Sequence, residues 1–124
     1  MNLHECLMIG AGGAAGAVAR ALVTVAGDRF GFSRLWATFT VNMIGSFCLG
    51  IVAAYLLRES SPGETLKPLV VIGFLGAFTT FSTLALELVG LARDGQMGWA
   101  IGYAFLTLAA GIGMVLVGQA LIRP

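Results

Sequence analysis

The apolar positions of this chain fall into four long runs that are separated by short polar linkers. The runs cover residues 5–27, 35–57, 68–92 and 99–122. Each is close to the roughly 20 residues that a helix needs to cross the hydrocarbon core of a bilayer. The pattern therefore predicts an all-α membrane protein, with four transmembrane helices in a single integral membrane domain over residues 1–124.

The third run carries glycines and hydroxyl groups where a membrane helix is usually apolar. They lie between Gly73 and Glu87, and are Gly73, Gly76, Thr79, Thr80, Ser82 and Thr83. Irregular backbone at membrane depth is tolerated only where it is buried in protein or lines a cavity, and ionisable groups there face the protein interior or a water-filled path. We therefore expect this helix to be broken near its middle, between Gly76 and Thr79, and to handle an ion. Freed carbonyl oxygens suit a small hard cation, whereas freed N–H groups favour an anion.

The spacing of four between Thr79, Thr83 and Glu87 also predicts a polar stripe along one face of the third helix. Phe81, within that segment, adds a different kind of anion contact. Aromatic rings are electropositive at their edges, so a phenyl edge faces an anion without a full charge. A small hydrated anion can then exchange water for protein contacts and still move on.

Four further polar residues lie within the apolar runs, and each admits two interpretations. Arg20 either extends to the interface along its aliphatic stem or lines a polar vestibule. Asn42 either donates its amide N–H groups to an anion or forms hydrogen bonds across helices. Tyr103 and Thr107, four residues apart, either extend a hydroxyl line or serve packing alone. Neighbouring residues decide between these readings, so the sequence leaves them open.

Composition supports the membrane class and limits the other functions. Of the 124 residues, 58% are hydrophobic and 10% are charged, whereas soluble domains carry about 25% charged residues. No basic patch suggests a nucleic-acid partner. The N-terminal segment MNLHECLMIG lacks the basic region of a secretory signal, so we expect the first run to remain in the mature protein. The one histidine, His4, has no nucleophile and acid around it in the pattern, and no enzymatic activity is expected.

Basic residues near the ends of the runs are almost evenly divided between the two faces of the membrane. One face has Arg58, Lys67 and Arg123, and the other has Arg29, Arg34 and Arg93, with Arg20 nearest to the second face. An excess of basic residues on one face sets orientation. This balance leaves two topologies open: insertion in both orientations, with antiparallel pairing of identical chains, or a single weakly biased orientation.

Two glycine pairs predict close helix packing. Gly12 and Gly16 in the first run, and Gly98 and Gly102 in the fourth, have the small-xxx-small spacing that lets membrane helices approach each other. Such pairs are common, and we interpret them as packing features of a compact bundle.

Three segments together carry a resemblance to a known family. They are GGAAGAVAR at 12–20, TFTVNMIGSF at 38–47 and GFLGAFTTFST at 73–83. These segments resemble the Fluc family of fluoride channels, also called CrcB, and the length and four-span layout agree over the whole chain. The pairing of a TVN element with a TTFST element is the specific part of the match.

The resemblance implies an antiparallel, dual-topology homodimer in the lipid of the bacterial inner membrane, with two fluoride pores at the subunit interface. Such a multi-pass channel passively releases cytoplasmic fluoride. It also implies a structural sodium ion on the dimer axis, which is not transported and is held by the backbone carbonyls of Gly76 and Thr79. The family's pore phenylalanine, gateway asparagine and first-span arginine correspond to Phe81, Asn42 and Arg20. The expected fluoride pathway comprises Asn42, Phe81, Ser82, Thr83, Tyr103, Thr107 and Arg20, with Thr80 and Glu87 as further polar positions.

The chain departs from the family pattern at two positions. Leu84 stands where many members have a second pore phenylalanine, and Ala77 stands where a second glycine is frequent. A proton-coupled dual-topology drug exporter remains the alternative, although its first-span carboxylate is represented here only by Glu5 at the edge of the run. A non-conducting assembly module is a second alternative, and it leaves Asn42 and the hydroxyl groups unexplained.

Overall fold

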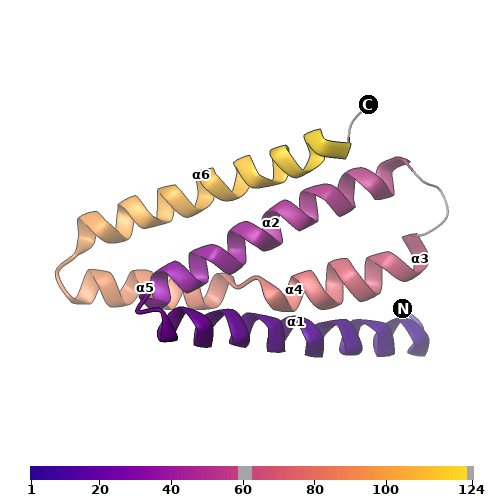
Figure 1. Cartoon of the computed structure of the whole chain (residues 1–124), viewed down its shortest axis with the longest axis horizontal. Helices are drawn as coiled ribbons and strands as arrows, with labels where there is room; N and C mark the ends of the chain where they lie inside the picture. Colours follow the sequence, from indigo (N-terminus) through magenta and orange to yellow (C-terminus); the bar gives the residue numbers. More distant parts are fainter. Residues whose placement is uncertain (59–62, 123–124) are drawn as a thin grey trace.

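The structure, a computed structural model, describes residues 1–58 and 63–122 and contains only helices within them (Figure 1). Four helical segments are long and apolar enough to cross a membrane, which confirms the predicted class. The elements are α1 (Leu3–Arg29), α2 (Arg34–Arg58), α3 (Gly63–Leu66), η1 (Lys67–Leu75), α4 (Gly76–Phe78), α5 (Phe81–Arg93) and α6 (Met97–Ile122). The linker residues 59–62, and Arg123 of the charge count, lie outside the described part of the chain.

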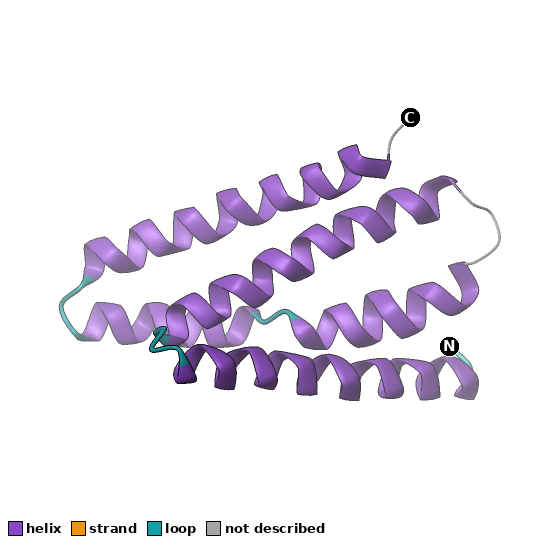
Figure 2. Ribbon diagram, viewed as in Figure 1, coloured by secondary structure: helices purple, strands orange, loops and turns teal. Residues whose placement is uncertain are grey.

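The third membrane span is assembled from several elements, and its break is visible as a short loop between two helical halves (Figure 2). The first half includes the π-helix η1, in which hydrogen bonds join residues five apart. Thr79 and Thr80 then adopt extended conformations, with φ/ψ of −80°/158° and −150°/120°. The expected break near the middle of the third helix is therefore present, and it lies at these two threonines.

The break also divides the polar stripe that the spacing predicts. Thr83 and Glu87 lie one turn apart on α5, but Thr79 ends the preceding helix. Its hydroxyl donates to the carbonyl of Leu75, 3.0 Å away, instead of continuing the line. The expectation of one stripe through all three residues is wrong, because two extended residues separate the halves.

Glycines let α1 pack directly against the backbone of η1, the element that α1 contacts most. A β-carbon at Gly12 would overlap the carbonyl oxygen of Leu69, and one at Gly16 would overlap that of Phe74. Small residues permit such close approach where lipid provides no hydrophobic drive for association. The packing interpretation of this glycine pair is confirmed.

The second predicted glycine pair does not serve packing within the chain. A β-carbon at Gly98 or Gly102 would meet no described atom within 4 Å. The close contact between α2 and α6 instead uses Gly50 and Gly118, where an added β-carbon would overlap the backbone of the facing helix. Spacing alone therefore identified one of the two helix contacts and missed the other.

The start of α1 and the end of α6 lie at the same end of the bundle, as an even number of spans requires (Figure 1). At the N-terminus the Glu5 N–H donates to the Asn2 side chain at 2.8 Å, and the Asn2 N–H donates to the Glu5 carboxylate at 2.9 Å. This reciprocal pair is a capping box, which satisfies N–H groups at the start of a helix. Glu5 is therefore part of the end of α1.

Candidate ion pathway

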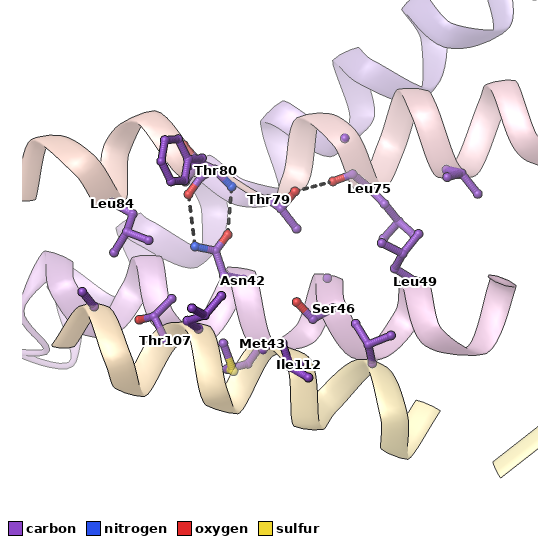
Figure 3. Close-up of a pocket in the computed structure, with 18 of the residues that line it drawn as sticks. Asn42, Met43, Ser46, Leu49, Leu75, Thr79, Thr80, Leu84, Thr107 and Ile112 are labelled. Atoms are coloured by element: carbon purple, nitrogen blue, oxygen red, sulfur yellow. Dashed lines mark hydrogen bonds between the residues drawn. The ribbon is translucent and has the colours of Figure 1, made fainter. Parts of the chain in front are cut away.

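Asn42 on α2 binds the backbone of the broken segment with both ends of its amide group (Figure 3). The N–H of Thr80 donates to Asn42 Oδ1 at 2.8 Å, and Asn42 Nδ2 donates to the carbonyl of Thr80 at 3.1 Å. Gly45, three residues further along α2, makes this approach possible, because a β-carbon there would overlap the side chain of Thr79. Of the two readings of Asn42, this geometry gives the contact across helices.

The break takes from the carbonyls of residues 76–79 the donors that a continuous helix would supply. In an α-helix the N–H of residue i donates to the carbonyl of residue i−4. The Thr80 N–H, which would bind the Gly76 carbonyl in a continuous helix, donates to Asn42 instead. The Thr83 N–H, which would bind the Thr79 carbonyl in a continuous helix, donates to the hydroxyl of Thr80 at 3.3 Å. The carbonyls of Gly76 and Thr79, the pair expected to hold a cation, are the two whose helical donors have bonded elsewhere.

Arg20 reaches the same break from α1. Its Nη1 donates to the carbonyl of Thr79 across 3.4 Å, and the side chain is half-buried. The guanidinium therefore does not extend to the membrane interface. It also lines a hollow of about 390 Å³ that includes Thr24, Asp28, Arg34, Thr38, Thr80 and Thr83. This arrangement agrees with the vestibule reading of Arg20.

A larger groove, of about 650 Å³, opens on the other side of the break (Figure 3). Polar groups gather at the broken segment in an otherwise apolar wall, and these are Asn42, Ser46, Thr79, Thr80 and Thr107. Phe81 lines the groove and is 81% exposed. Leu84, the departure from the family pattern, lines it as well, so the groove has one phenylalanine and one leucine at the two positions.

Glu87 belongs to a polar cluster between α5, α2 and α6. Thr38 donates its hydroxyl to Glu87 Oε1 at 2.6 Å, and the hydroxyl of Tyr103 donates to the carbonyl of Leu35 at 2.6 Å. Two buried oxygens, Oε2 of Glu87 on α5 and Oγ1 of Thr107 on α6, have no hydrogen-bond partner among the described residues. Unpaired polar atoms are costly away from water, and a bound water is one way to satisfy them.

The predicted site residues therefore fall into three neighbouring groups. Asn42, Phe81 and Thr107 line the groove, whereas Arg20 and Thr83 line the hollow, and Thr80 borders both. Tyr103 is buried beside the Glu87 cluster, and Ser82 is exposed and lines neither space. The break connects these groups.

Thr38 is a residue that the sequence interpretation missed. It binds Glu87 and lines the hollow, and it lies four residues before Asn42 on the same face of α2. That spacing was a usable signal, since Thr38 and Asn42 both belong to the TFTVN segment.

Acidic, histidine and cysteine side chains offer no alternative metal site within the part of the chain whose side chains are described. Among residues 1–58 and 65–122, no group of three or more such side chains is placed to hold a metal ion. Any cation at the break would therefore depend on backbone and hydroxyl oxygens, which are ligands of hard ions such as sodium.

Comparison with known proteins gives one consistent result. A family model described as "CrcB-like protein, Camphor Resistance (CrcB)" matches residues 7–119. A protein of Allorhizobium ampelinum named "Fluoride-specific ion channel FluC" is 38% identical over 98% of each chain. One of the same name from Chlorobaculum tepidum is 39% identical over 99% of this chain and 98% of its own. "Fluoride-specific ion channel FluC 1" of Mycolicibacterium paratuberculosis is 36% identical over 98% and 92%.

These matches extend across all four apolar helices, so they concern the whole bundle rather than one motif. The matched relatives are bacterial, and the four helices make this chain a multi-pass membrane protein. The chain belongs to the CrcB family, the family of the fluoride-specific ion channels named FluC.

Proposed function

We propose that this chain is a fluoride-selective passive channel through which cytoplasmic fluoride leaves the cell. The observation that carries the proposal is the exposed ring of Phe81, which lies in the groove beside the broken backbone. A ring edge there would contact fluoride through its positive edge, and neighbouring hydroxyls would replace part of the hydration shell. None of these groups carries a full positive charge, so the anion would not be held too tightly to leave.

The proposed route uses the three groups of polar residues in turn. Arg20 would attract fluoride into the hollow, where Thr80 and Thr83 supply hydroxyls. Ser82, which is exposed outside both spaces, would join the route only once a second chain covers it. Phe81 and Asn42 would form the narrow part at the break. The remaining positions of the route are Tyr103, Thr107 and Glu87. The two unpaired oxygens at Glu87 and Thr107 support a hydrated route, because water there would donate hydrogen bonds to both.

The functional unit in this proposal is an antiparallel homodimer. The irregular backbone at Thr79 and Thr80 lines an open groove of about 650 Å³, and such backbone at membrane depth is tolerated only where protein or a water-filled cavity covers it. The even division of basic residues permits the opposite orientation of a second copy. Each pore would then lie between the chains, and lipid would contact the outer faces of α1 and α6.

We further propose a structural sodium ion at the centre of this dimer. The carbonyls of Gly76 and Thr79 fit such an ion, because their usual helical donors bind Asn42 and Thr80 instead. Each chain would supply two carbonyl oxygens, and oxygen ligands are what hard cations prefer. The ion would supply a fixed positive charge beside the anion route without moving through it.

Fluoride efflux from liposomes tests the function directly. Vesicles that contain the purified protein and are loaded with sodium fluoride or sodium chloride should release fluoride rapidly and chloride only at the rate of empty vesicles. Release should not require a proton gradient. Fluoride release that depends on such a gradient would favour the proton-coupled exporter, and the absence of any release would reject the channel.

A further inference from the structure

We infer that Asn42 is a positioning residue for the carbonyl site at the break: its amide holds the third span open and thereby leaves the Gly76 carbonyl free for a cation. This role rests on the proposed channel with its sodium ion, and it goes beyond the pathway role proposed for Asn42 above. Its basis is the pair of hydrogen bonds between Asn42 and Thr80, at 2.8 and 3.1 Å.

The alternative to the break is a continuous helix. In that form the Thr80 N–H would bind the Gly76 carbonyl and the Thr83 N–H would bind the Thr79 carbonyl. An N–H group without a partner is costly at membrane depth. The broken form frees the N–H groups of residues 80–83, and those of Thr80 and Thr83 have replacement acceptors in the structure.

One replacement is local and the other is not. The Thr83 N–H finds the hydroxyl of Thr80 on its own span, a helix N-cap of the ordinary kind. The Thr80 N–H finds Asn42 on α2. The same Asn42 side chain also donates to the Thr80 carbonyl, so a single residue of another helix binds both backbone groups of Thr80. The broken form thus depends on Asn42 to accept the hydrogen bond of the Thr80 N–H, which would otherwise bind the Gly76 carbonyl.

The two possible roles of Asn42 predict different effects when its side chain is removed. If Asn42 holds the break open, its loss lowers the fraction of protein in the cation-binding form. The apparent sodium affinity then falls in proportion to that fraction. If Asn42 only contacts the anion, its loss lowers the fluoride flux but leaves the sodium requirement unchanged. One N–H of Nδ2 is not used by Thr80, so an additional anion contact is compatible with the positioning role.

The test measures the sodium concentration that gives half-maximal fluoride flux, with N-methyl-D-glucamine replacing sodium to hold ionic strength constant. We expect Asn42→Ala to raise this concentration about tenfold, which corresponds to one missing hydrogen bond of average strength or slightly more. Thr40→Val is the matched control on the same helix, because the Thr40 hydroxyl donates only to the carbonyl of Trp36 on α2. It should keep the wild-type requirement.

A second measurement does not depend on flux. Sodium should raise the thermal unfolding temperature of the purified wild type, because a ligand that binds only the folded state stabilises it. The sodium concentration needed for this rise should also increase about tenfold in Asn42→Ala. Asn42→Asp, which keeps an acceptor for the Thr80 N–H, should not increase it, and this variant serves if the alanine variant does not fold.

The outcomes separate the two proposals. A wild type that shows the sodium-dependent stabilisation but no fluoride flux would reject the channel and leave the role of Asn42 testable by stability alone. A sodium requirement that is unchanged in Asn42→Ala, or raised equally in Asn42→Asp, would overturn the inference, as would a wild type indifferent to sodium in both measurements.

Discussion

Three phenylalanines of the third span have different environments although they lie close together in sequence. Phe74 and Phe78 stack with their ring centroids 5.8 Å apart, and Phe78 is 5% exposed. Phe81 is 81% exposed. The break accounts for the difference, because two extended residues, Thr79 and Thr80, separate Phe81 from the helix that carries the other two rings.

Replacement of this ring tests the pore assignment at the residue scale. We expect Phe81→Ile to lower the fluoride flux by roughly fivefold to tenfold, since a favourable aromatic contact is worth about 1 kcal/mol. Isoleucine keeps the apolar volume but has no electropositive edge. The measurement is fluoride efflux from liposomes at saturating sodium.

Phe105→Ile is the matched control. Phe105 on α6 is 71% exposed but does not line the groove, so its replacement should leave the flux unchanged. Wild-type flux in Phe81→Ile would remove Phe81 from the route.

At the scale of elements, the break in the third span is held by contacts from two other helices, α1 and α2. Asn42 on α2 and Arg20 on α1 both bind backbone groups of the broken segment. Gly12 and Gly16 fix α1 against η1 at backbone contact. The position of the first half of the third span relative to the second is therefore set by its neighbours on α1 and α2.

Sodium removal tests the carbonyl site that this arrangement leaves open. Replacement of sodium by N-methyl-D-glucamine on both sides of the membrane should reduce fluoride efflux to the rate of empty vesicles, because the bulky cation does not fit between backbone carbonyls. Efflux should return when sodium is restored. A flux that is indifferent to this exchange would reject the sodium site.

Added bulk at the contact between α1 and η1 should destabilise the bundle. Gly16→Ala places a β-carbon against the carbonyl of Phe74, and overpacking of this kind costs about 2 kcal/mol of unfolding free energy. The thermal unfolding temperature in detergent should fall accordingly.

Gly10→Ala is the control on the same helix, because a β-carbon at Gly10 would meet no described atom within 4 Å. It should be neutral or slightly stabilising, since alanine favours a helix interior more than glycine does. Equal effects of both substitutions would contradict the packing account.

At the scale of the whole molecule, a single chain leaves its largely apolar groove, with the polar break inside it, open on its own surface. The groove lies between α2, α6 and the broken span, and it contains the break, Phe81 and Leu84. Leu84 takes the position of a second aromatic ring in the family pattern. Two chains that meet at this groove would bring together two phenylalanines, one from each copy.

Orientation is the measurement that tests the antiparallel dimer. In a variant with Cys6 and Cys48 replaced by alanine, the Gln96→Cys substitution in the α5–α6 turn should be labelled about equally from each side of the membrane.

A second test changes the basic residues on each face. Replacing Arg29, Arg34 and Arg93 with glutamine should fix one orientation and abolish flux. Replacing Arg58 and Lys67 should favour the other, and coexpression of the two variants should restore flux. Labelling from one side alone would reject the antiparallel dimer.

The class of protein followed from the sequence, because burial in lipid requires long apolar runs and the four runs are long enough. The break was also predictable. Glycines and adjacent threonines lower helix propensity, and the segment from Gly73 to Thr83 concentrates both. Gly76, Asn42 and Phe81 were candidates from their residue types, and their specific roles were predicted from the resemblance to the family. The chain belongs to that family, and the roles stay predictions.

Only the tertiary structure decided which groups meet. It divided the expected stripe at Thr79, added Thr38 as the partner of Glu87, and replaced the predicted Gly98 and Gly102 contact with one at Gly50. These outcomes depend on how one helix lies against another, and local spacing contains no information on that. A hydrogen bond such as the one from Thr80 to Asn42, 38 residues apart, exists because packing brings α2 to the break, and it redirects a donor that the local sequence alone would assign to Gly76.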